Sequence, residues 1–129
     1  MNQEEHNLQC ACVKWFAYQH PELQGLLFAV PNGGARSKST AGKLKAEGVV
    51  PGVADLILLV PSILDFSMRG NCGTIAFSGA LCIEMKTARG TQMETQRKWQ
   101  MRVMSHGYKY AVCRSLEEFI NTIENYLKT

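Results

Sequence analysis

Apolar side chains recur at helical spacing near both ends of the chain. Residues 3–19 and 116–127 each place hydrophobic side chains three or four positions apart, which predicts an amphipathic helix in both places. The second segment follows Ser115 and Glu118, a Ser-x-x-Glu pair of the kind that caps a helix. The apolar positions are Leu8, Cys12, Trp15 and Phe16 in the first helix and Leu116, Phe119, Ile120, Ile123 and Leu127 in the last.

Short apolar runs between these two helices predict strands. Each run is four to seven residues long and is bounded by proline, glycine or polar residues, as strands usually are. The expected strands span 26–32, 54–60, 80–86 and 108–114.

Two further helices are expected inside the chain. A brief one covers 40–48 and ends at Gly48. A longer one runs from a Thr91–Glu94 capping pair to about His106, with Gly107 as its C-terminal stop.

The order of these elements predicts an α/β fold. Apart from the brief helix it reads helix, strand, strand, strand, helix, strand, helix, which fits one small mixed sheet flanked by helices. Residues 61–79 are mixed in character, contain several turn formers and are predicted to be a loop or hairpin insertion. With 129 residues, the chain fits a single domain over 1–129.

Composition excludes several classes of protein. The 46% hydrophobic and 19% charged residues do not fit a disordered tail, a collagen-like repeat or a coiled coil. No apolar run is long enough to span a membrane, and the polar N-terminus lacks the regions of a signal peptide. Five cysteines without CxxC spacing indicate free thiols; a zinc site from His6, Cys10, Cys12 and His20 fits the usual ligand spacing poorly. We therefore expect a cytoplasmic protein without a membrane partner.

Positive charge is concentrated in the middle of the chain. Residues 36–109 contain 11 basic and 5 acidic side chains, whereas the two flanks contain 3 basic and 6 acidic ones. A polyanion such as DNA would bind the central part, although a solvated lysine-rich face explains the same pattern.

Three acidic residues interrupt apolar patterns. Glu5 falls within the apolar stripe of the first helix, and Asp55 begins the Leu-Ile-Leu-Leu-Val strand. Glu84 shares one face of its strand with Lys86, about 7 Å away, because side chains alternate along a strand. Each has an ordinary structural explanation: an exposed first turn for Glu5, a strand-end turn for Asp55, and an ion pair for Glu84 with Lys86.

One neutral polar residue adds to this set. Gln96 lies on the same helix face as Trp99 and Val103, and a surface glutamine near a helix end is its structural explanation. Three carboxylates with a nearby lysine suit Mg²⁺ or Mn²⁺. Such an ion polarises a phosphodiester and lowers the pKa of a bound water. The residue types therefore predict a site for phosphodiester hydrolysis.

Longer motifs give the chain a family resemblance. The motifs are PNGGAR (31–36), AGKLKAEGVVPGVADLILL (41–59), IEMKTARG (83–90), Gln96 and Trp99 in Q-x-x-W, and HGYKYAVCRS (106–115). With this set, the chain resembles the VRR-NUC domain, the virus-type replication-repair nuclease branch of the PD-(D/E)xK superfamily, over nearly its whole length. That resemblance implies a restriction-endonuclease-like αβββαβ core.

The resemblance implies roles for individual residues. Asp55 and Glu84 would bind the metal, with Glu5 and the backbone carbonyl of Met85 as further ligands. Lys86 would be the catalytic lysine of E-x-K, and Gln96 would orient it or contact the scissile region. The residues expected to bind nucleic acid are Asn32, Arg36, Lys38, Lys43 and Arg89.

The chain departs from the family pattern at Ala54 and in the length between Asp55 and Glu84, and its helical acid has two candidates. Ala54 stands where a proline is expected before the aspartate, and Glu4 competes with Glu5 as the helical acid. The stretch between Asp55 and Glu84 is also longer than in compact members, which bears on the DNA shapes that fit.

Stand-alone phage and bacterial members resemble small enzymes that dimerise and cut branched DNA, including four-way (Holliday) junctions. The resemblance thus implies a Mg²⁺- or Mn²⁺-dependent DNA endonuclease acting as a homodimer, without a nucleotide cofactor. The alternative is a non-catalytic nucleic-acid-binding module of a phage recombination or replication complex.

Overall fold

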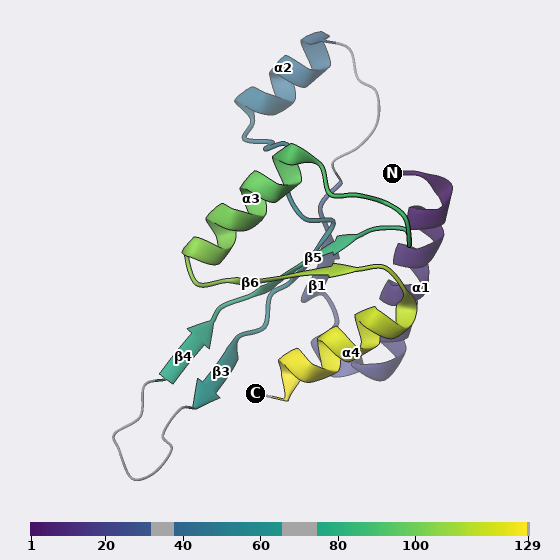
Figure 1. Cartoon of the computed structure of the whole chain (residues 1–129), viewed down its shortest axis with the longest axis vertical. Coiled ribbons are helices and arrows are strands. Elements are labelled where there is room, and N and C mark those ends of the chain that lie inside the picture. The colour runs from purple at the N-terminus through teal and green to yellow at the C-terminus, as the bar shows by residue number, and fades with distance from the viewer. Residues whose placement is uncertain (32–37, 66–74, 129) are drawn as a thin grey trace.

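The computed structural model describes residues 1–31, 38–65 and 75–128 of the chain. Its helices and strands follow one another in an α/β order (Figure 1). The helices are α1 (Gln3–Gln19), the 3₁₀ helix η1 (Pro21–Leu23), α2 (Lys38–Ala46), α3 (Glu94–Ser105) and α4 (Leu116–Leu127). The strands are β1 (Leu27–Ala29), β2 (Leu56–Leu58), β3 (Ser62–Asp65), β4 (Ile75–Ser78), β5 (Leu81–Met85) and β6 (Lys109–Cys113).

A four-stranded mixed sheet forms the centre of the fold, as the sequence predicted. Its strand order is β1-β2-β5-β6. The pairs β1–β2 and β2–β5 are antiparallel, and β5–β6 is parallel. The strands β5 and β6 are joined through α3, the kind of crossover that a parallel pair requires.

The two faces of the sheet have different coverings. Leu81, Ile83 and Met85 face a buried cluster that includes Phe16 of α1 and Phe119 of α4. Figure 1 shows α1 and α4 on this side of the sheet and α3 on the other. The alternation expected for residues 80–86 is therefore correct, and it turns Glu84 toward the face that α3 partly covers.

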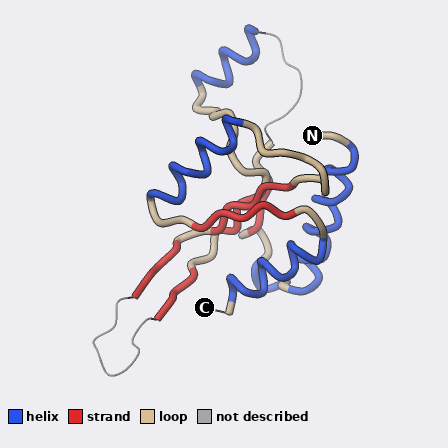
Figure 2. The backbone as a smooth tube through the Cα atoms, viewed as in Figure 1, coloured by secondary structure: helices blue, strands red, loops and turns tan. Residues whose placement is uncertain are grey.

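The predicted insertion over 61–79 includes a hairpin. Strands β3 and β4 pair antiparallel, with Ser62 opposite Ser78, as a separate two-stranded sheet. Figure 2 shows these strands leading away from the central sheet. Residues 66–74 of the insertion lie outside the described part of the chain.

Several element boundaries differ from the sequence prediction. Helix α3 begins at Glu94, so the expected Thr91–Glu94 capping pair is wrong. The side chain of Gln96 caps it instead, because its Oε1 accepts the backbone N–H of Met93 at 2.8 Å. The short helix η1 was not predicted; its first residue is Pro21, which suits an N-terminal helical position.

Other boundaries shift by a few residues. Strand β1 is shorter than predicted, but Val30 N–H still donates to Asp55 O at 2.9 Å beyond it. Strand β2 likewise covers only the centre of the expected segment 54–60. The cap predicted for α4 is present, since Ser115 Oγ accepts the backbone N–H of Glu118 at 3.1 Å.

The cysteines that the structure describes are free thiols, as expected. Cys10 is exposed, and Cys12, Cys82 and Cys113 are buried. Burial raises the pKa of Cys12 to about 12 and that of Cys82 to about 11, so both stay protonated near neutral pH. Cys72 lies outside the described residues.

The described helices include none that combines the length and hydropathy needed to cross a membrane.

Candidate active site

A glycine turn fixes the approach of the chain to Asp55. Gly52 has a φ of 83°, a conformation that L side chains rarely adopt. A Cβ at this position would also overlap the backbone of Thr95 and lie 2.9 Å from the amide nitrogen of Gln96. Only glycine allows this close approach, which packs the turn against the first residues of α3.

Asp55 lies at the start of β2, and its carboxylate reaches across to β5. Asp55 Oδ2 accepts the backbone N–H of Met85 at 2.7 Å. Burial is the main cause that raises the pKa of Asp55, and the negative charge of Glu5 raises it further. The Met85 N–H and the positive charge of Lys86 act in the opposite direction. Asp55 is thus a partly desolvated carboxylate among other charged groups.

Glu84 is a completely buried carboxylate, with 0% of its surface exposed. Its Oε1 accepts a hydrogen bond from the hydroxyl of Tyr110 at 3.0 Å. Its Oε2 is buried and has no hydrogen-bond partner in the part of the chain that the structure describes. Burial is the main cause that raises the pKa of Glu84, and the negative charge of Asp55 raises it further. The hydrogen bond from Tyr110 and the positive charge of Lys86 lower it. A buried, half-satisfied carboxylate is costly and indicates a functional position.

Lys86 follows Glu84 on the same face and is only 7% exposed. Its positive charge lowers the pKa of both Asp55 and Glu84, which puts it within electrostatic reach of both carboxylates. Among the described residues, however, Lys86 forms no direct ion pair with Glu84. A structural ion pair therefore does not explain why these two residues share the face.

Glu5 comes from the first turn of α1, where the side chain of Asn2 accepts its backbone N–H at 2.8 Å. Glu5 is partly buried, whereas Glu4 is exposed. Since the charge of Glu5 also raises the pKa of Asp55, Glu5 is the helical acid within electrostatic reach of Asp55. One turn further along α1, Gln9 Oε1 is buried without a described hydrogen-bond partner.

Gln96 has a structural role in this arrangement. Its side-chain oxygen caps α3, and among the described residues no hydrogen bond joins it to Lys86. The catalytic role that the resemblance implied for Gln96 stays a prediction, as does the carbonyl of Met85 as a metal ligand.

Two polar residues beside Glu84 were not found from the sequence. Tyr110 donates to Glu84, and Gln92 lies close enough to lower the pKa of both Glu84 and Tyr110. Tyr110 belongs to a strand whose own pattern does not fix which face it presents, so its direction depended on the register with β5. That register pairs Cys82 with Tyr110 and Glu84 with Val112, which turns Tyr110 to the Glu84 face.

The residues expected to bind nucleic acid are only partly described. Lys43 is exposed on α2, and Arg89 is exposed in the loop that follows Lys86. Lys38 is the first residue of α2, and Asn32 and Arg36 lie outside the described residues. Figure 1 shows α2 standing beyond the end of the sheet, next to the start of α3.

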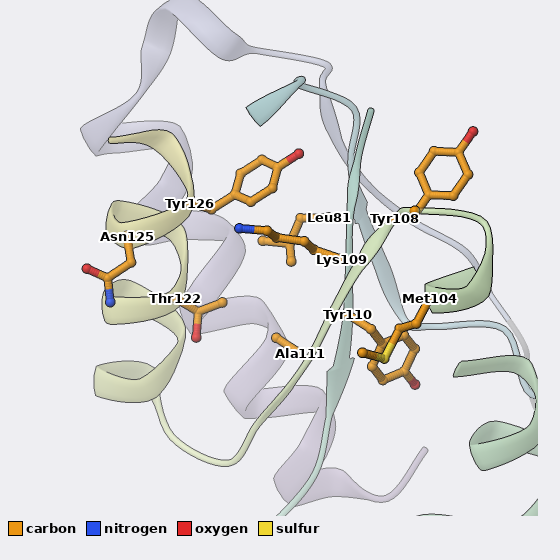
Figure 3. Close-up of a pocket in the computed structure, with 10 residues that line it drawn as sticks. Leu81, Met104, Tyr108, Lys109, Tyr110, Ala111, Thr122, Asn125 and Tyr126 are labelled. Carbon is orange, nitrogen blue, oxygen red and sulfur yellow. The ribbon is translucent and has the colours of Figure 1, made fainter. Parts of the chain in front are cut away.

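No carboxylate lines the pocket in Figure 3, although Tyr110, the hydrogen-bond donor to Glu84, is one of its lining residues. The pocket has a volume of about 400 Å³ and lies along β6, between the end of α3 and the last turns of α4. Lys109, Asn125 and Tyr126 are among the residues that line it, and it contains no acidic side chain. The pocket therefore offers no carboxylate ligand for a metal.

A divalent metal ion needs several oxygen ligands that lie close together. No group of three His, Cys, Asp or Glu side chains within the described ranges is already arranged to hold a metal. The donor types nevertheless fit a hard cation, because Asp55, Glu84 and Glu5 supply carboxylate oxygens. Glu84 Oε2, which has no hydrogen-bond partner in the described part of the chain, is a ligand atom of the required kind.

These observations define the class of protein: an α/β fold with one buried carboxylate, one partly buried carboxylate and a buried lysine beside a mixed sheet. The VRR-NUC domain family model matches residues 1–117, and the chain belongs to this nuclease family. A solved structure described as a VRR_NUC domain protein matches with a TM-score of 0.74 and 23% sequence identity. The match covers 99% of this chain and 91% of that one, and it supports the fold. No curated protein matches the chain.

Proposed function

We propose that this protein is a divalent-metal-dependent DNA endonuclease of the PD-(D/E)xK type. The observation that carries the proposal is the buried carboxylate of Glu84, whose Oε2 has no described partner, beside Asp55 and Lys86. Membership in a nuclease family supports phosphodiester hydrolysis as the activity that these residues would serve.

Asp55, Glu84 and Glu5 would hold Mg²⁺ or Mn²⁺, together with the backbone carbonyl of Met85. When bound, the metal supplies Lewis acidity toward the phosphodiester and lowers the pKa of a coordinated water. Lys86 is the positive group of the site, so it would neutralise charge that develops on the phosphate or orient the attacking water. Its near-complete burial strengthens that electrostatic effect, because water screens it little.

We propose branched DNA, such as a four-way junction, as the preferred substrate and a homodimer as the working form. The exposed side chains of Lys43 and Arg89 would contact phosphates on either side of the carboxylate cluster. Two copies related by a two-fold axis would present two sites to two strands, which matches the symmetry of a junction.

A non-catalytic DNA-binding module is the second candidate function. It is favoured by the lack of a ready-made three-ligand metal cluster among the described residues. Against it stand the residue types at positions 55, 84 and 86, since a domain that only binds DNA has no need for a buried carboxylate without a partner.

Cleavage of a panel of labelled DNAs tests the proposal. The panel contains a four-way junction, a flap, a plain duplex and a single strand, each incubated with Mg²⁺, Mn²⁺ or EDTA. We expect paired, symmetric nicks in the junction, lost in EDTA and in Lys86→Ala but retained in Lys14→Ala, which changes an exposed lysine of α1. Junction binding without cleavage in either metal would support the binding module instead.

A further inference from the structure

Among the residues that the structure describes, one carboxylate oxygen of Glu84 accepts a hydrogen bond and the other does not. The Tyr110 hydroxyl donates to Oε1 at 3.0 Å, whereas Oε2 is buried and without a hydrogen-bond partner among the described residues. A carboxylate held at one oxygen loses rotational freedom, while the lone pairs of the other oxygen stay available. Tyr110 therefore determines where Glu84 Oε2 points.

Tyr110 is itself held in place from two sides. Its position in β6, in parallel register with Cys82 of β5, turns its side chain to the same face as Glu84. The ring of Trp99 from α3 packs against it, with ring centroids 6.1 Å apart at an angle of 59°. The phenol thus approaches Glu84 from a fixed direction, and as a phenol it is a hydrogen-bond donor near neutral pH.

Gln92 connects this pair to the neighbouring helix. Its Nε2 donates to Gln100 Oε1 on α3 at 2.7 Å. The Gln92 side chain also lies close enough to Glu84 and Tyr110 to lower the pKa of both groups. Gln92 thereby joins the loop after Lys86 to α3 at the point where Tyr110 meets Glu84.

We propose that Tyr110, supported by Gln92, is a positioning residue that orients Glu84 so that Oε2 is presented to a divalent cation. The inference rests on the proposed function, because it takes Glu84 to be a metal ligand. Neighbours that hold a ligating side chain in place commonly change metal affinity by about 10–100-fold.

Binding of Mn²⁺ to the full chain, measured by calorimetry without DNA, tests the proposal. Tyr110→Phe removes the hydroxyl and keeps the ring that packs on Trp99, so the fold should persist. We expect Mn²⁺ affinity to fall about 10-fold. Gln92→Met provides a second variant outside the strand and should weaken binding in the same direction by a smaller factor.

Two matched tyrosine variants are the controls. Tyr108→Phe changes an exposed tyrosine two residues away in sequence. Tyr126→Phe removes a hydroxyl that donates to Val60 O at 2.6 Å, a hydrogen bond to a backbone carbonyl and not to Glu84. Both should bind Mn²⁺ like the wild type, even where Tyr126→Phe lowers thermal stability.

Cleavage kinetics give a second readout that a merely structural role would not change. With a four-way junction as substrate, Tyr110→Phe should lower kcat at low Mg²⁺ and recover when Mg²⁺ is raised, with KM for DNA unchanged. A loss of kcat that no Mg²⁺ concentration restores would overturn the positioning role.

The outcomes separate this inference from the proposed function. If Glu84→Gln abolishes Mn²⁺ binding while Tyr110→Phe binds normally, the positioning role is wrong and the metal site stands. If the wild type binds no Mn²⁺, or Glu84→Gln binds it unchanged, Glu84 is not a metal ligand and the proposed function fails together with the inference.

Discussion

Glu84 and Asp55 are carboxylates that the fold desolvates without fully compensating them. Burial is the first cause of the raised pKa of each, and the negative charges of neighbouring carboxylates add to it. Buried charges of this kind reduce stability and persist where they serve a site. We therefore expect both carboxylates to lower the stability of the metal-free protein, and a bound cation to offset that cost.

Replacing Glu84 with glutamine should stabilise the metal-free protein and abolish cleavage. The amide keeps an acceptor for Tyr110 but removes a buried charge, which we expect to raise stability by about 1–3 kcal/mol. Thermal unfolding in EDTA measures the change. Glu94→Gln, at an exposed position of α3 where the side chain pairs with Arg97, is the control and should change Tm only slightly. A lower Tm for Glu84→Gln would show that its buried charge is not a net cost.

The raised pKa values also predict a pH dependence. A carboxyl whose folded pKa exceeds its unfolded pKa binds protons more readily when folded, so stability falls as pH rises through that interval. For Asp55 and Glu84 the fall begins near their ordinary values of 3.8 and 4.5 and ends at the raised folded pKa of each. In EDTA, the wild type should lose stability relative to the Asp55→Asn, Glu84→Gln double variant as pH increases from about 4. A difference that does not change with pH would show that the two carboxyls titrate normally.

The elements of the fold bring the site together through a few close contacts. The turn at Gly52 packs on the first residues of α3, and Asp55 at the start of β2 accepts the N–H of Met85 in β5. Arg114, after β6, donates to the carbonyl of Thr87 at 2.9 Å and to that of Gly90. Asp55 and Arg114 thereby connect the start of β2 and the segment after β6 to the part of the chain that holds Glu84 and Lys86, while the Gly52 turn contacts α3.

Gly52→Ala tests the contact between the turn and α3. The added methyl group would overlap the backbone of Thr95 and require a positive φ at alanine, which should destabilise the protein by about 1–3 kcal/mol. Urea unfolding gives the value. The control is Gly42→Ala in α2, where a Cβ meets no atom within 4 Å and helix propensity should raise stability slightly. Equal effects of the two substitutions would contradict the close approach.

For the protein as a whole, part of the fold could be predicted from sequence. Periodicity identified α1, α4 and the faces of β5, because these depend on local alternation of apolar and polar residues. The residues around Glu84 were harder: Tyr110 meets Glu84 only through the parallel β5–β6 register, which no local pattern encodes. The sequence also placed Gln96 correctly in a helix. Its capping contact with Met93 could not be predicted, because that contact depends on the residue at which α3 begins.

The charge distribution of the whole chain predicts a salt effect on DNA binding. Lys43 and Lys45 are exposed on α2 and are expected to neutralise DNA phosphates. Each lysine–phosphate contact that a substitution removes should reduce the slope of log affinity against log salt by about 0.9. The Lys43→Ala, Lys45→Ala variant should therefore bind junction DNA more weakly and with a shallower slope, measured by fluorescence anisotropy in Ca²⁺. Lys14→Ala on α1 serves as the control. An unchanged slope in the α2 variant would remove α2 from the DNA interface.

The carboxylates of Asp55 and Glu84 are expected to support metal-dependent cleavage of DNA, and titration with Mg²⁺ tests this expectation. The quantity to measure is the rate of nicking of a four-way junction as Mg²⁺ rises from EDTA to excess, for the wild type and Asp55→Asn. We expect a rate that rises to saturation with Mg²⁺ in the wild type and stays at background in the variant at every concentration. Equal rates for the two proteins, or wild-type cleavage that persists in EDTA, would contradict a metal-dependent site at these carboxylates.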